Sequence, residues 1–462
     1  MIVQRFELAT LSPDARRRLL RRSEREIHRE LEAARAILDA VRERGDAALI
    51  ELTERFDGVR LTPAAMKLDR AEIAERAEAL RRVHPALDEA IRVAARQIEA
   101  FHRAQLPKPV WWTEVSPGVF AGERVTPIPD VAVYVPRGKG SFPSVLLMLA
   151  VPARVAGVPR RIVLTPPAPG GGLDPAVVLA ADHAGVDAVY TVGGAQAIAA
   201  VAFGTETVPK MHKVIGPGNA YVTAAKRLLV GTIDIGILAG PSEAIVLADG
   251  SADPERVARD WLNEAEHGPD SAALLVTDDG ALLEAAESAL RRLLGRLPEG
   301  RRRFAEAVFR TYGGGVIARS MDEAIAFVND YAPEHLVLHV RDPHALLWRL
   351  EHAGEILLGP WTPIALGNFV VGTNAILPTG GHAKTTSAVS VWDFLKRTSL
   401  AWATEAGYRR LRPYARLLAE VEGFPAHALA LEDEEAAGAA RPGEPAVGPV
   451  EEESAADGNR RG

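Results

Sequence analysis

The stretch Asn-Glu-Ala-Glu-His-Gly-Pro-Asp at residues 263–270 carries two potential metal ligands at the end of a helix. Glu264 and His267 are three residues apart, so on a helix they share one face. Gly268 and Pro269 follow at once and end the helix. Carboxylate and imidazole groups are common ligands of Zn²⁺. This spacing indicates part of a metal shell, with the remaining ligands supplied by other segments.

A second group, Tyr-Ala-Pro-Glu-His-Leu at residues 331–336, carries the materials of acid-base catalysis. Glu334 and His335 are adjacent at the start of a predicted strand. Adjacent side chains on a strand point to opposite faces, so both reach one site only if the backbone is irregular there. A carboxylate and an imidazole can activate water and take up a proton near neutral pH. The dipeptide alone is equally consistent with an exposed Glu-His pair.

Three further polar residues are weaker candidates. Asn368 lies among apolar residues in Leu-Gly-Asn-Phe-Val-Val-Gly-Thr-Asn, and Glu422 and His427 flank a turn in Glu-Gly-Phe-Pro-Ala-His. Taken singly, each is better interpreted as a capping or loop residue. The basic run at residues 16–26 could suggest phosphate binding, but Arg and Glu alternate from Ser23 onward, which favours a solvated helix face.

The elements that must position these residues indicate an α/β fold. Residues 13–104 repeat apolar positions at helical spacing and predict a helical arm. From residue 131, short β-branched runs alternate with helical stretches, which is typical of parallel strands joined by crossover helices. The predicted strands are 131–135, 162–165, 188–192, 213–215, 244–249, 272–277, 315–318, 335–340 and 355–358. After Lys384 the pattern is helical again.

In such folds, sites lie beyond the carboxyl ends of the strands, so we expect the site at that edge. Glycine- and proline-rich turns are predicted at strand ends: Val-Pro-Arg-Gly-Lys-Gly, Val-Gly-Gly-Ala-Gln-Ala, Ile-Gly-Pro-Gly-Asn and Ala-Gly-Pro-Ser-Glu. The second of these could present free backbone amides to a phosphate. The ordinary dinucleotide fingerprint is absent, because the chain lacks a complete Gly-x-Gly-x-x-Gly in that context.

Composition excludes several classes of protein. The chain has no cysteine, which rules out disulfides, thiolate catalysis and Cys-type metal sites. Its net charge of -7 lies mostly in residues 432–462, so the nearly neutral body predicts no binding to nucleic acid or membrane. We find no signal peptide or membrane-spanning pattern and expect a cytoplasmic protein. The acidic tail, 432–462, has almost nothing to bury and is expected to be disordered.

Taken in order, these segments resemble the histidinol dehydrogenase family, over roughly residues 120 to 430. The resemblance rests on Tyr-Val-Pro-Arg-Gly-Lys-Gly-Ser-Phe-Pro-Ser, Val-Gly-Gly-Ala-Gln-Ala, Gly-Pro-Gly-Asn-Ala-Tyr, Ala-Gly-Pro-Ser-Glu, Glu-Ala-Glu-His-Gly-Pro-Asp-Ser, Tyr-Ala-Pro-Glu-His-Leu, Gly-Thr-Asn-Ala-Ile-Leu-Pro-Thr-Gly-Gly and Phe-Leu-Lys-Arg. It implies a homodimer with two incomplete Rossmann-like parallel-sheet domains, an N-terminal helical arm and a C-terminal helical tail that completes the partner's site. The implied divisions are a first α/β domain (1–125 and 244–385), a second (126–243), a helical dimerisation segment (386–431) and the disordered tail (432–462).

The resemblance also implies site residues. One Zn²⁺ per subunit is held by Glu264, His267, Asn368 and His427, although the family usually has Gln and Asp at the first and third of these. That exchange keeps one carboxylate, one amide oxygen and two imidazoles, so metal binding is expected to survive. Glu334 is the water-activating carboxylate and His335 the general base. The remaining contacts fall, for NAD, on Tyr134, Gln196 and Asn219, and, for substrate, on Ser242, Glu422, His335 and the four metal ligands.

The implied reaction is oxidation of L-histidinol through the aldehyde to L-histidine with two NAD. Ala375 stands where the family has a histidine near the substrate, and its side chain forms no hydrogen bond. A paralogue that oxidises another small polar alcohol with the same zinc and NAD machinery is therefore the alternative. A zinc hydrolase is a further alternative, because a metal with Glu and His also serves amide or ester cleavage. A simple binding module fits the residues least well.

Overall fold

The structure is a computed structural model of the 462-residue chain, and it describes residues 3–22, 28–137, 140–237 and 239–432. Its contacts divide the chain into two compact units. The first comprises Met1–Pro109 and Val125–Arg397, and the second Val110–Arg124 and Thr398–Gly462. The predicted disorder of the acidic tail concerns residues that, apart from Glu432, lie outside the described ones.

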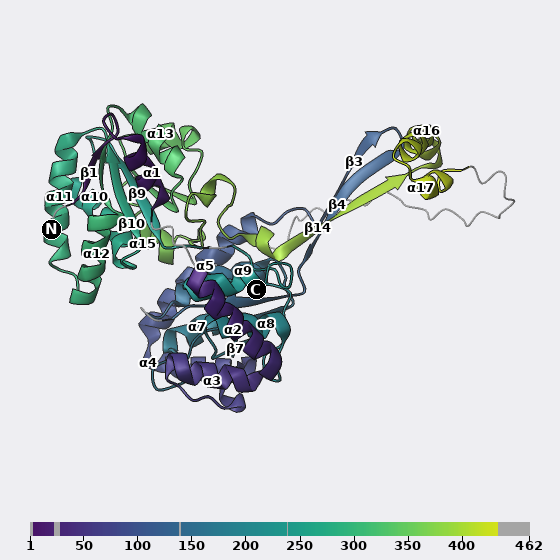
Figure 1. Cartoon of the computed structure of the whole chain (residues 1–462), viewed down its shortest axis with the longest axis horizontal. Helices are drawn as coiled ribbons and strands as arrows, with labels where there is room; N and C mark the ends of the chain where they lie inside the picture. The colour runs from purple at the N-terminus through teal and green to yellow at the C-terminus, as the bar shows by residue number, and fades with distance from the viewer. Residues whose placement is uncertain (1–2, 23–27, 138–139, 238, 433–462) are drawn as a thin grey trace, which may run out of the picture. The chain divides into compact units, whose positions relative to one another are not determined.

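The first unit contains a six-stranded sheet, called sheet A, in which every neighbouring pair is parallel (Figure 1). Its strands, in spatial order, are β1 (Arg5–Glu7), β11 (Gly314–Ile317), β10 (Ala272–Thr277), β9 (Glu243–Ala248), β12 (His335–His339) and β13 (Glu355–Leu358). The strands β10, β9 and β12 are buried along their whole length. Nearly continuous apolar runs of this kind suit a parallel sheet covered on both faces.

Helices cover both faces of sheet A. Alternate strand residues, such as Val246 and Leu275, pack with α10 (Pro254–Asn263), α11 (Gly280–Leu294) and α12 (Glu299–Thr311). Their neighbours, such as Leu247 and Leu274, pack with α13 (Met321–Tyr331) and the apolar side of α1 (Pro13–Arg21). Val337 packs with the first group of helices. His335 is two residues before Val337 on the same strand, so its side chain points to the same face of the sheet.

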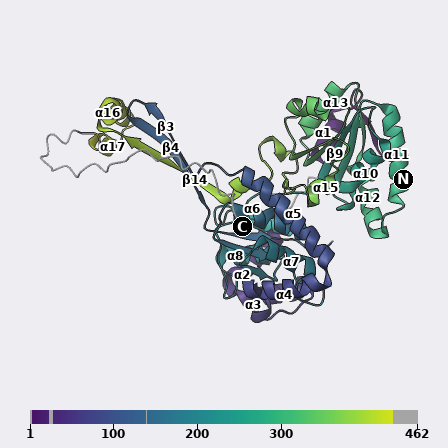
Figure 2. The same cartoon turned by 180° about the vertical axis from the view of Figure 1, so that it is seen from behind.

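Sheet B, also in the first unit, has the order β2-β7-β6-β5-β8. It comprises β2 (Lys67–Asp69), β7 (Ala188–Tyr190), β6 (Arg160–Leu164), β5 (Asp130–Tyr134) and β8 (Val214–Ile215), and only the β2–β7 pair is antiparallel. One core joins the sheet to α4 (Arg70–Val83), α5 (Pro85–Ala104), α6 (Pro143–Val155) and α7 (Pro175–Ala184). The other joins it to α2 (His28–Arg44), α3 (Asp46–Asp57), α8 (Gly194–Phe203) and α9 (Ala220–Leu228). Figure 2 shows the helices α2 to α8 from behind.

The α/β architecture with two largely parallel sheets confirms the predicted fold class. The helical arm is also present, but it differs from the expected division in one respect. Helices α2 to α5 pack against sheet B rather than sheet A, and β2 from the same region pairs with β7. The apolar faces of these helices are buried in the two cores of sheet B. Their order in the sequence did not reveal which sheet they would cover. The ranges 126–243 and 244–385 hold the central strands of sheets B and A.

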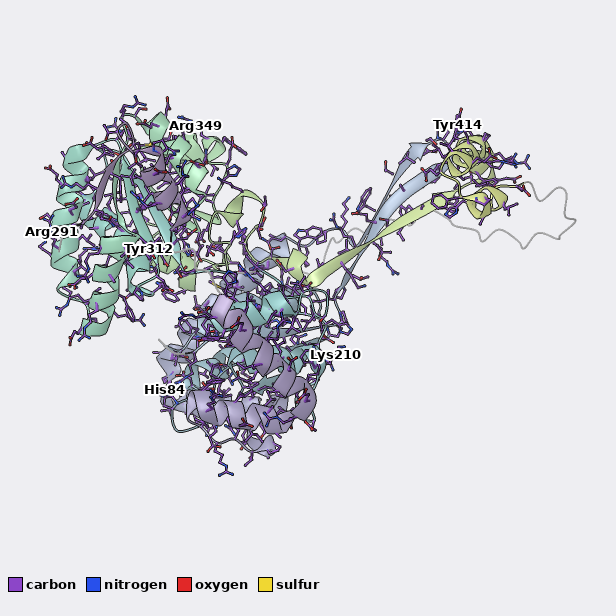
Figure 3. All side chains as sticks on the ribbon, viewed as in Figure 1. His84, Lys210, Arg291, Tyr312, Arg349 and Tyr414 are labelled. Carbon is purple, nitrogen blue, oxygen red and sulfur yellow. The ribbon has the colours of Figure 1, made fainter. Side chains whose placement is uncertain are left out.

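The second unit has a three-stranded sheet of order β14-β4-β3 and two helices. Strands β3 (Val110–Ser116) and β4 (Val119–Pro127) form an antiparallel hairpin. Strand β14 (Leu395–Ala403) corrects the prediction of an all-helical segment at 386–431, because its largely exposed residues pair along β4. The helices α16 (Glu405–Val421) and α17 (Pro425–Leu429) follow. Large apolar side chains stay exposed on α16, among them Tyr414, Leu417 and Leu418 (Figure 3).

Across the described ranges, no helix combines the length and the apolar character needed to span a bilayer.

Candidate active site

The residues best suited to catalysis lie at the amino ends of the strands of sheet A. His335 and Glu355 are the first residues of β12 and β13, and Glu243 is the first residue of β9. These three strands are neighbours in the sheet. The expectation of a site at the carboxyl ends is therefore wrong for this group. A crossover helix runs antiparallel to its strands, so the carboxyl end of α10, which carries Glu264, reaches the amino edge.

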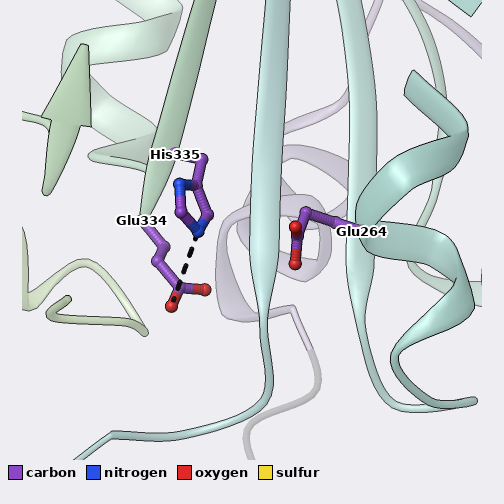
Figure 4. A group of neighbouring side chains, drawn as sticks. All are labelled: Glu264, Glu334 and His335. Carbon is purple, nitrogen blue, oxygen red and sulfur yellow. Dashed lines mark ion pairs between the residues drawn. The ribbon is translucent and has the colours of Figure 1, made fainter. Parts of the chain in front are cut away.

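Glu264, Glu334 and His335 form one buried group, in which ligand-type atoms of all three lie within 4.8 Å of one another (Figure 4). The Oε1 atom of Glu334 lies 4.0 Å from the Nε2 atom of His335. Adjacent residues reach one site because Glu334 lies in a bend before β12, after Ala332 has adopted a left-handed conformation with φ of 51°. The irregular backbone that this pair required is thus present.

Burial dominates the electrostatics of this group. It raises the pKa of Glu334 to about 8, and the charge of Glu264 acts in the same direction. Burial alone lowers the pKa of His335, but the hydrogen bond to Glu355 and the charges of Glu334 and Glu264 outweigh it and raise that pKa to about 9. The charges of Glu334 and His335 each favour the charged form of the other, so the charge of His335 lowers the pKa of Glu334 and the charge of Glu334 raises the pKa of His335.

A series of buried charged residues fixes the position of Glu334. The backbone amide of Glu243 donates to Oε2 of Glu334 at 2.8 Å, and the Glu243 side chain pairs with Nε of Arg22 at 2.9 Å. The Arg22 guanidinium lies 3.7 Å from the ring centroid of Tyr331, and its side chain is only 5% exposed. The expectation of a solvated basic face holds for residues 16–21 of α1, none of which is buried, but is wrong for Arg22. Residues 23–26 of the same run lie outside the described residues.

The predicted helix end is present, and it forms one side of a metal site. Helix α10 ends at Asn263, a turn of 3-10 helix (Glu264–Glu266) follows, and the amide of His267 donates to the carbonyl of Glu264 at 3.2 Å. Nδ1 of His267 lies 3.4 Å from Oε2 of Glu264. Asn263 donates to the other oxygen of Glu264 at 3.0 Å. The two side chains therefore share one face, as their spacing predicted.

The donors fit a divalent zinc ion. Asn368 lies on α15 (Ile364–Phe369), and its Oδ1 atom is buried without a hydrogen-bond partner among the described residues. A buried amide oxygen normally has a partner, so this atom suits a ligand. The buried Glu264 carboxylate and the His267 imidazole add the other donor types that zinc takes. Ligand-type atoms of Glu334 and His335 also lie within 4.8 Å of the Glu264 carboxylate.

The two tail residues lie in the second unit. His427 is exposed on α17, and Glu422 is exposed at the carboxyl end of α16. Glu264 and His335 belong to the first unit. The predicted roles of Glu422 and His427 at that site therefore remain proposals. Ser242 is half-buried directly before β9, at the amino edge that also carries Glu334.

The residues predicted to bind NAD follow strands of sheet B. Tyr134 ends β5, and its hydroxyl accepts a hydrogen bond from the amide of Gly194 at 3.0 Å; burial raises its pKa to about 12. Gln196 is buried on α8, with Oε1 lacking a partner among the described residues. Asn219 follows β8 and caps α9, accepting from two amides at 3.1 Å. These residues lie at the expected carboxyl edge, and the free Gln196 oxygen suits a dinucleotide ligand.

Lys226 supports the turn that carries Asn219, and it gives a pH prediction. Its Nζ atom donates to the carbonyl of Gly216 at 2.6 Å, and burial, with the charge of Lys213, lowers the pKa of Lys226 to about 7. The unfolded chain then binds more protons than the native chain between about pH 7 and 10.5, so stability rises with pH in that window. Lys226→Met should therefore gain stability over the wild type at pH 6, with an advantage that shrinks by about 4 kcal/mol towards pH 10.5.

Thermal unfolding of both proteins across this range measures the effect. The exposed Lys210 (Figure 3) provides the control, since Lys210→Met removes the same charge without relieving any burial. A stability difference between Lys226→Met and the wild type that is flat with pH would contradict the prediction.

Ala375 lies among apolar groups. Its side chain packs against the core that joins sheet B to α6, and its amide faces the sulfur of Met148 at 3.3 Å. The preceding Asn374 donates to the Met148 carbonyl at 2.6 Å. None of these contacts of the Ala375 side chain supplies the hydrogen bond that the histidine expected at this position would form with a substrate.

Sequence reasoning missed Arg22, Glu243 and Glu355. Each is a charged residue beside or within an apolar strand or at a helix end, which is the signal that could have identified them: burial of such groups requires a charged partner. The contact of Glu243 with Glu334 spans 91 positions and that of Glu355 with His335 spans 20. Arg22 contacts Glu243 across 221 positions, from residue 22 to residue 243. No local pattern pointed to these contacts.

The structure defines the class as an α/β protein with two largely parallel sheets and a buried carboxylate-imidazole group at the amino edge of sheet A. The model of the family described as histidinol dehydrogenase matches residues 20–433. The chain therefore belongs to the histidinol dehydrogenase family of NAD-dependent oxidoreductases.

Relatives and a solved structure support this membership. The chain is 48% identical to the histidinol dehydrogenase of Synechocystis over 93% of this chain and 98% of the relative. It is 49% identical to a histidinol dehydrogenase homolog of Cereibacter sphaeroides, over 92% and 96% of the two chains. The crystal structure of histidinol dehydrogenase from Elizabethkingia anophelis is similar, with a TM-score of 0.87, 34% identity and coverage of 93% and 97%.

Proposed function

We propose that this chain oxidises L-histidinol through the aldehyde to L-histidine with two NAD, in the cytoplasm. The observation that carries the proposal is the buried group of Glu264, Glu334 and His335 at the amino edge of sheet A, in a chain of the histidinol dehydrogenase family. Family membership favours this reaction over a zinc hydrolase.

The metal in this proposal is one Zn²⁺ per subunit, held by Glu264, His267, Asn368 and His427. The buried and unpartnered oxygen of Asn368 supports the assignment, as does the shared face of Glu264 and His267. NAD is held by Tyr134, Gln196 and Asn219, and substrate by Ser242 and Glu422 beside the metal ligands and His335. Glu422, as a carboxylate, suits a substrate ammonium group.

When bound, Zn²⁺ would supply positive charge that orients the substrate and opposes protonation of His335, and NAD would supply the hydride acceptor. Within the chain, Nε2 of His335 accepts the proton of the substrate hydroxyl as the carbinol carbon loses a hydride. For the second oxidation, Glu334 and His335 activate a water molecule, which adds to the aldehyde carbon; the resulting gem-diol then gives up a hydride to the second NAD and becomes the carboxylic acid. Burial of both side chains limits access of bulk water to the reacting atoms.

A homodimer with tail exchange is part of the proposal. The exposed apolar side chains of α16, which include Leu417, Leu418 and Val421, need a partner surface in solution. A second copy of the chain satisfies this requirement and brings His427 and Glu422 to the site.

A second candidate function is oxidation of another small polar alcohol by the same machinery. The apolar surroundings of Ala375 favour it, because they provide no hydrogen bond to an imidazole substrate. Some relatives are named histidinol dehydrogenase and others histidinol dehydrogenase homolog. Cereibacter sphaeroides has one of each, 48% and 49% identical to this chain.

Absorbance of NADH with the zinc-loaded protein tests the proposal. L-Histidinol is compared with other amino alcohols and with hydroxylated and sulfonated diols. Turnover of L-histidinol with two NADH per molecule supports the first function. Turnover of another alcohol alone supports the second, and no NADH from any of them would refute both.

A further inference from the structure

The imidazole of His335 is held by a second buried carboxylate, that of Glu355. Nδ1 of His335 lies 3.1 Å from Oε2 of Glu355, and the two side chains are 4% and 6% exposed. The contact follows from sheet register: His335 and Glu355 are directly paired residues of the parallel strands β12 and β13. Paired residues of this kind present their side chains on the same face.

Glu355 is itself fixed in place. Its Oε1 atom accepts a hydrogen bond from the hydroxyl of Thr373 at 2.6 Å, and its amide donates to the carbonyl of Glu334 at 2.9 Å. A side chain at Gly367 would lie 3.1 Å from Oε2, so α15 packs its backbone directly against this carboxylate. Both oxygens are therefore engaged, and the one facing His335 has little freedom to move.

This arrangement selects one tautomer of His335. A carboxylate only accepts hydrogen bonds, so the imidazole must present a proton at Nδ1. The neutral ring then has its lone pair at Nε2, the atom that lies 4.0 Å from Oε1 of Glu334. A base must have its lone pair on the atom that faces the reacting group. The opposite tautomer would bury an unpaired carboxylate oxygen and present a proton to the site.

The chain contains an internal comparison. His339 lies four residues further along β12, is equally buried, and pairs with Asp260 at 2.7 Å. There the nitrogen bound to the carboxylate is Nε2. The cluster of ligand-type atoms around Glu264 does not include His339 among the described residues. Of these two histidines, only His335 has its Nε2 atom facing the site.

We infer that Glu355 is a positioning residue that fixes the tautomer and ring orientation of His335 for proton transfer at Nε2. The inference rests on the proposed function for the role of His335 as base. Glu355 touches neither substrate nor cofactor in this role. It acts through the imidazole and connects the base to Thr373 and to the helix that carries Asn368.

Glu355→Gln tests the inference, because glutamine keeps the size of the side chain but can donate as well as accept. Its amide group can donate to Nδ1 and stabilise the wrong tautomer. With the best alcohol of the panel above, we expect kcat to fall by about 10- to 100-fold while KM and zinc content change little. Glu355→Asp restores the charge with a shorter side chain and should give an intermediate kcat.

Asp260→Asn is the matched control, since it removes the buried carboxylate partner of His339, which lies on the same strand as His335. We expect it to lower the melting temperature at least as much as Glu355→Gln but to leave kcat near the wild-type value. Equal losses of kcat in both variants would show a structural role and overturn the inference.

NMR detection of the His335 tautomer requires no enzyme turnover, so it tests this inference independently of the proposed function. In protein labelled with ¹⁵N at its histidines, the His335 signal is assigned by its loss in His335→Asn. At a pH where the ¹⁵N shifts themselves show the ring to be neutral, we expect Nδ1 to carry the proton in the wild type and a mixture of tautomers in Glu355→Gln. The same tautomer in both proteins would refute the inference, even if every alcohol proved inactive.

Discussion

His335→Asn should lower NADH formation by at least about 100-fold while zinc content stays unchanged. Asparagine can still bond Glu355 but has no basic nitrogen for the substrate proton. Metal content should persist because the proposed ligands, Glu264, His267, Asn368 and His427, are all retained. Steady-state NADH formation and metal analysis of the purified variant measure the two quantities.

His339→Asn is the control for this prediction, because it changes a buried histidine on the same strand whose partner, Asp260, lies outside the site. It should cost stability and leave most of the turnover. Near-normal activity in His335→Asn would remove this residue from its role as base. Loss of zinc in that variant would instead make His335 a ligand, in keeping with its closeness to Glu264.

Removal of the chain from Glu420 onward should lower zinc content strongly, whereas removal of the residues after Glu435 should change it little. The first cut deletes His427 and Glu422, which we propose as a metal ligand and a substrate contact, and the second deletes neither. A missing ligand typically leaves an open, weak site, so metal should be lost on dialysis. Metal analysis and NADH formation after dialysis measure the effect.

Single substitution and subunit mixing refine this test. His427→Ala should reproduce the metal loss, whereas His84→Ala, at another exposed histidine (Figure 3), should not. If the tail serves the partner subunit, mixing His427→Ala with His335→Asn restores some activity, since one mixed site then contains both intact groups. Full zinc content in both the truncated chain and His427→Ala would contradict the proposed ligand.

Local sequence was sufficient wherever a feature depends on neighbours in the chain. The spacing of Glu264 and His267 and the stop at Gly268 placed both side chains on one face of a helix end, as the structure has them. Alternation of β-branched runs with helical stretches indicated the α/β class, because each element satisfies its own backbone hydrogen bonds or those of an adjacent strand. Family motifs then assigned roles that these patterns left open.

Tertiary structure decided what lies beside those residues. The pairing of β12 with β13 brings Glu355 to His335, and the reach of Arg22 to Glu243 depends on how α1 packs on sheet A. The location of the group at the amino edge likewise depends on which helix end meets which strand end. Hydrophobic burial drives these packings and is non-directional, so sequence alone specified the elements and their chemistry, whereas only the folded arrangement specified which charged groups share a buried site.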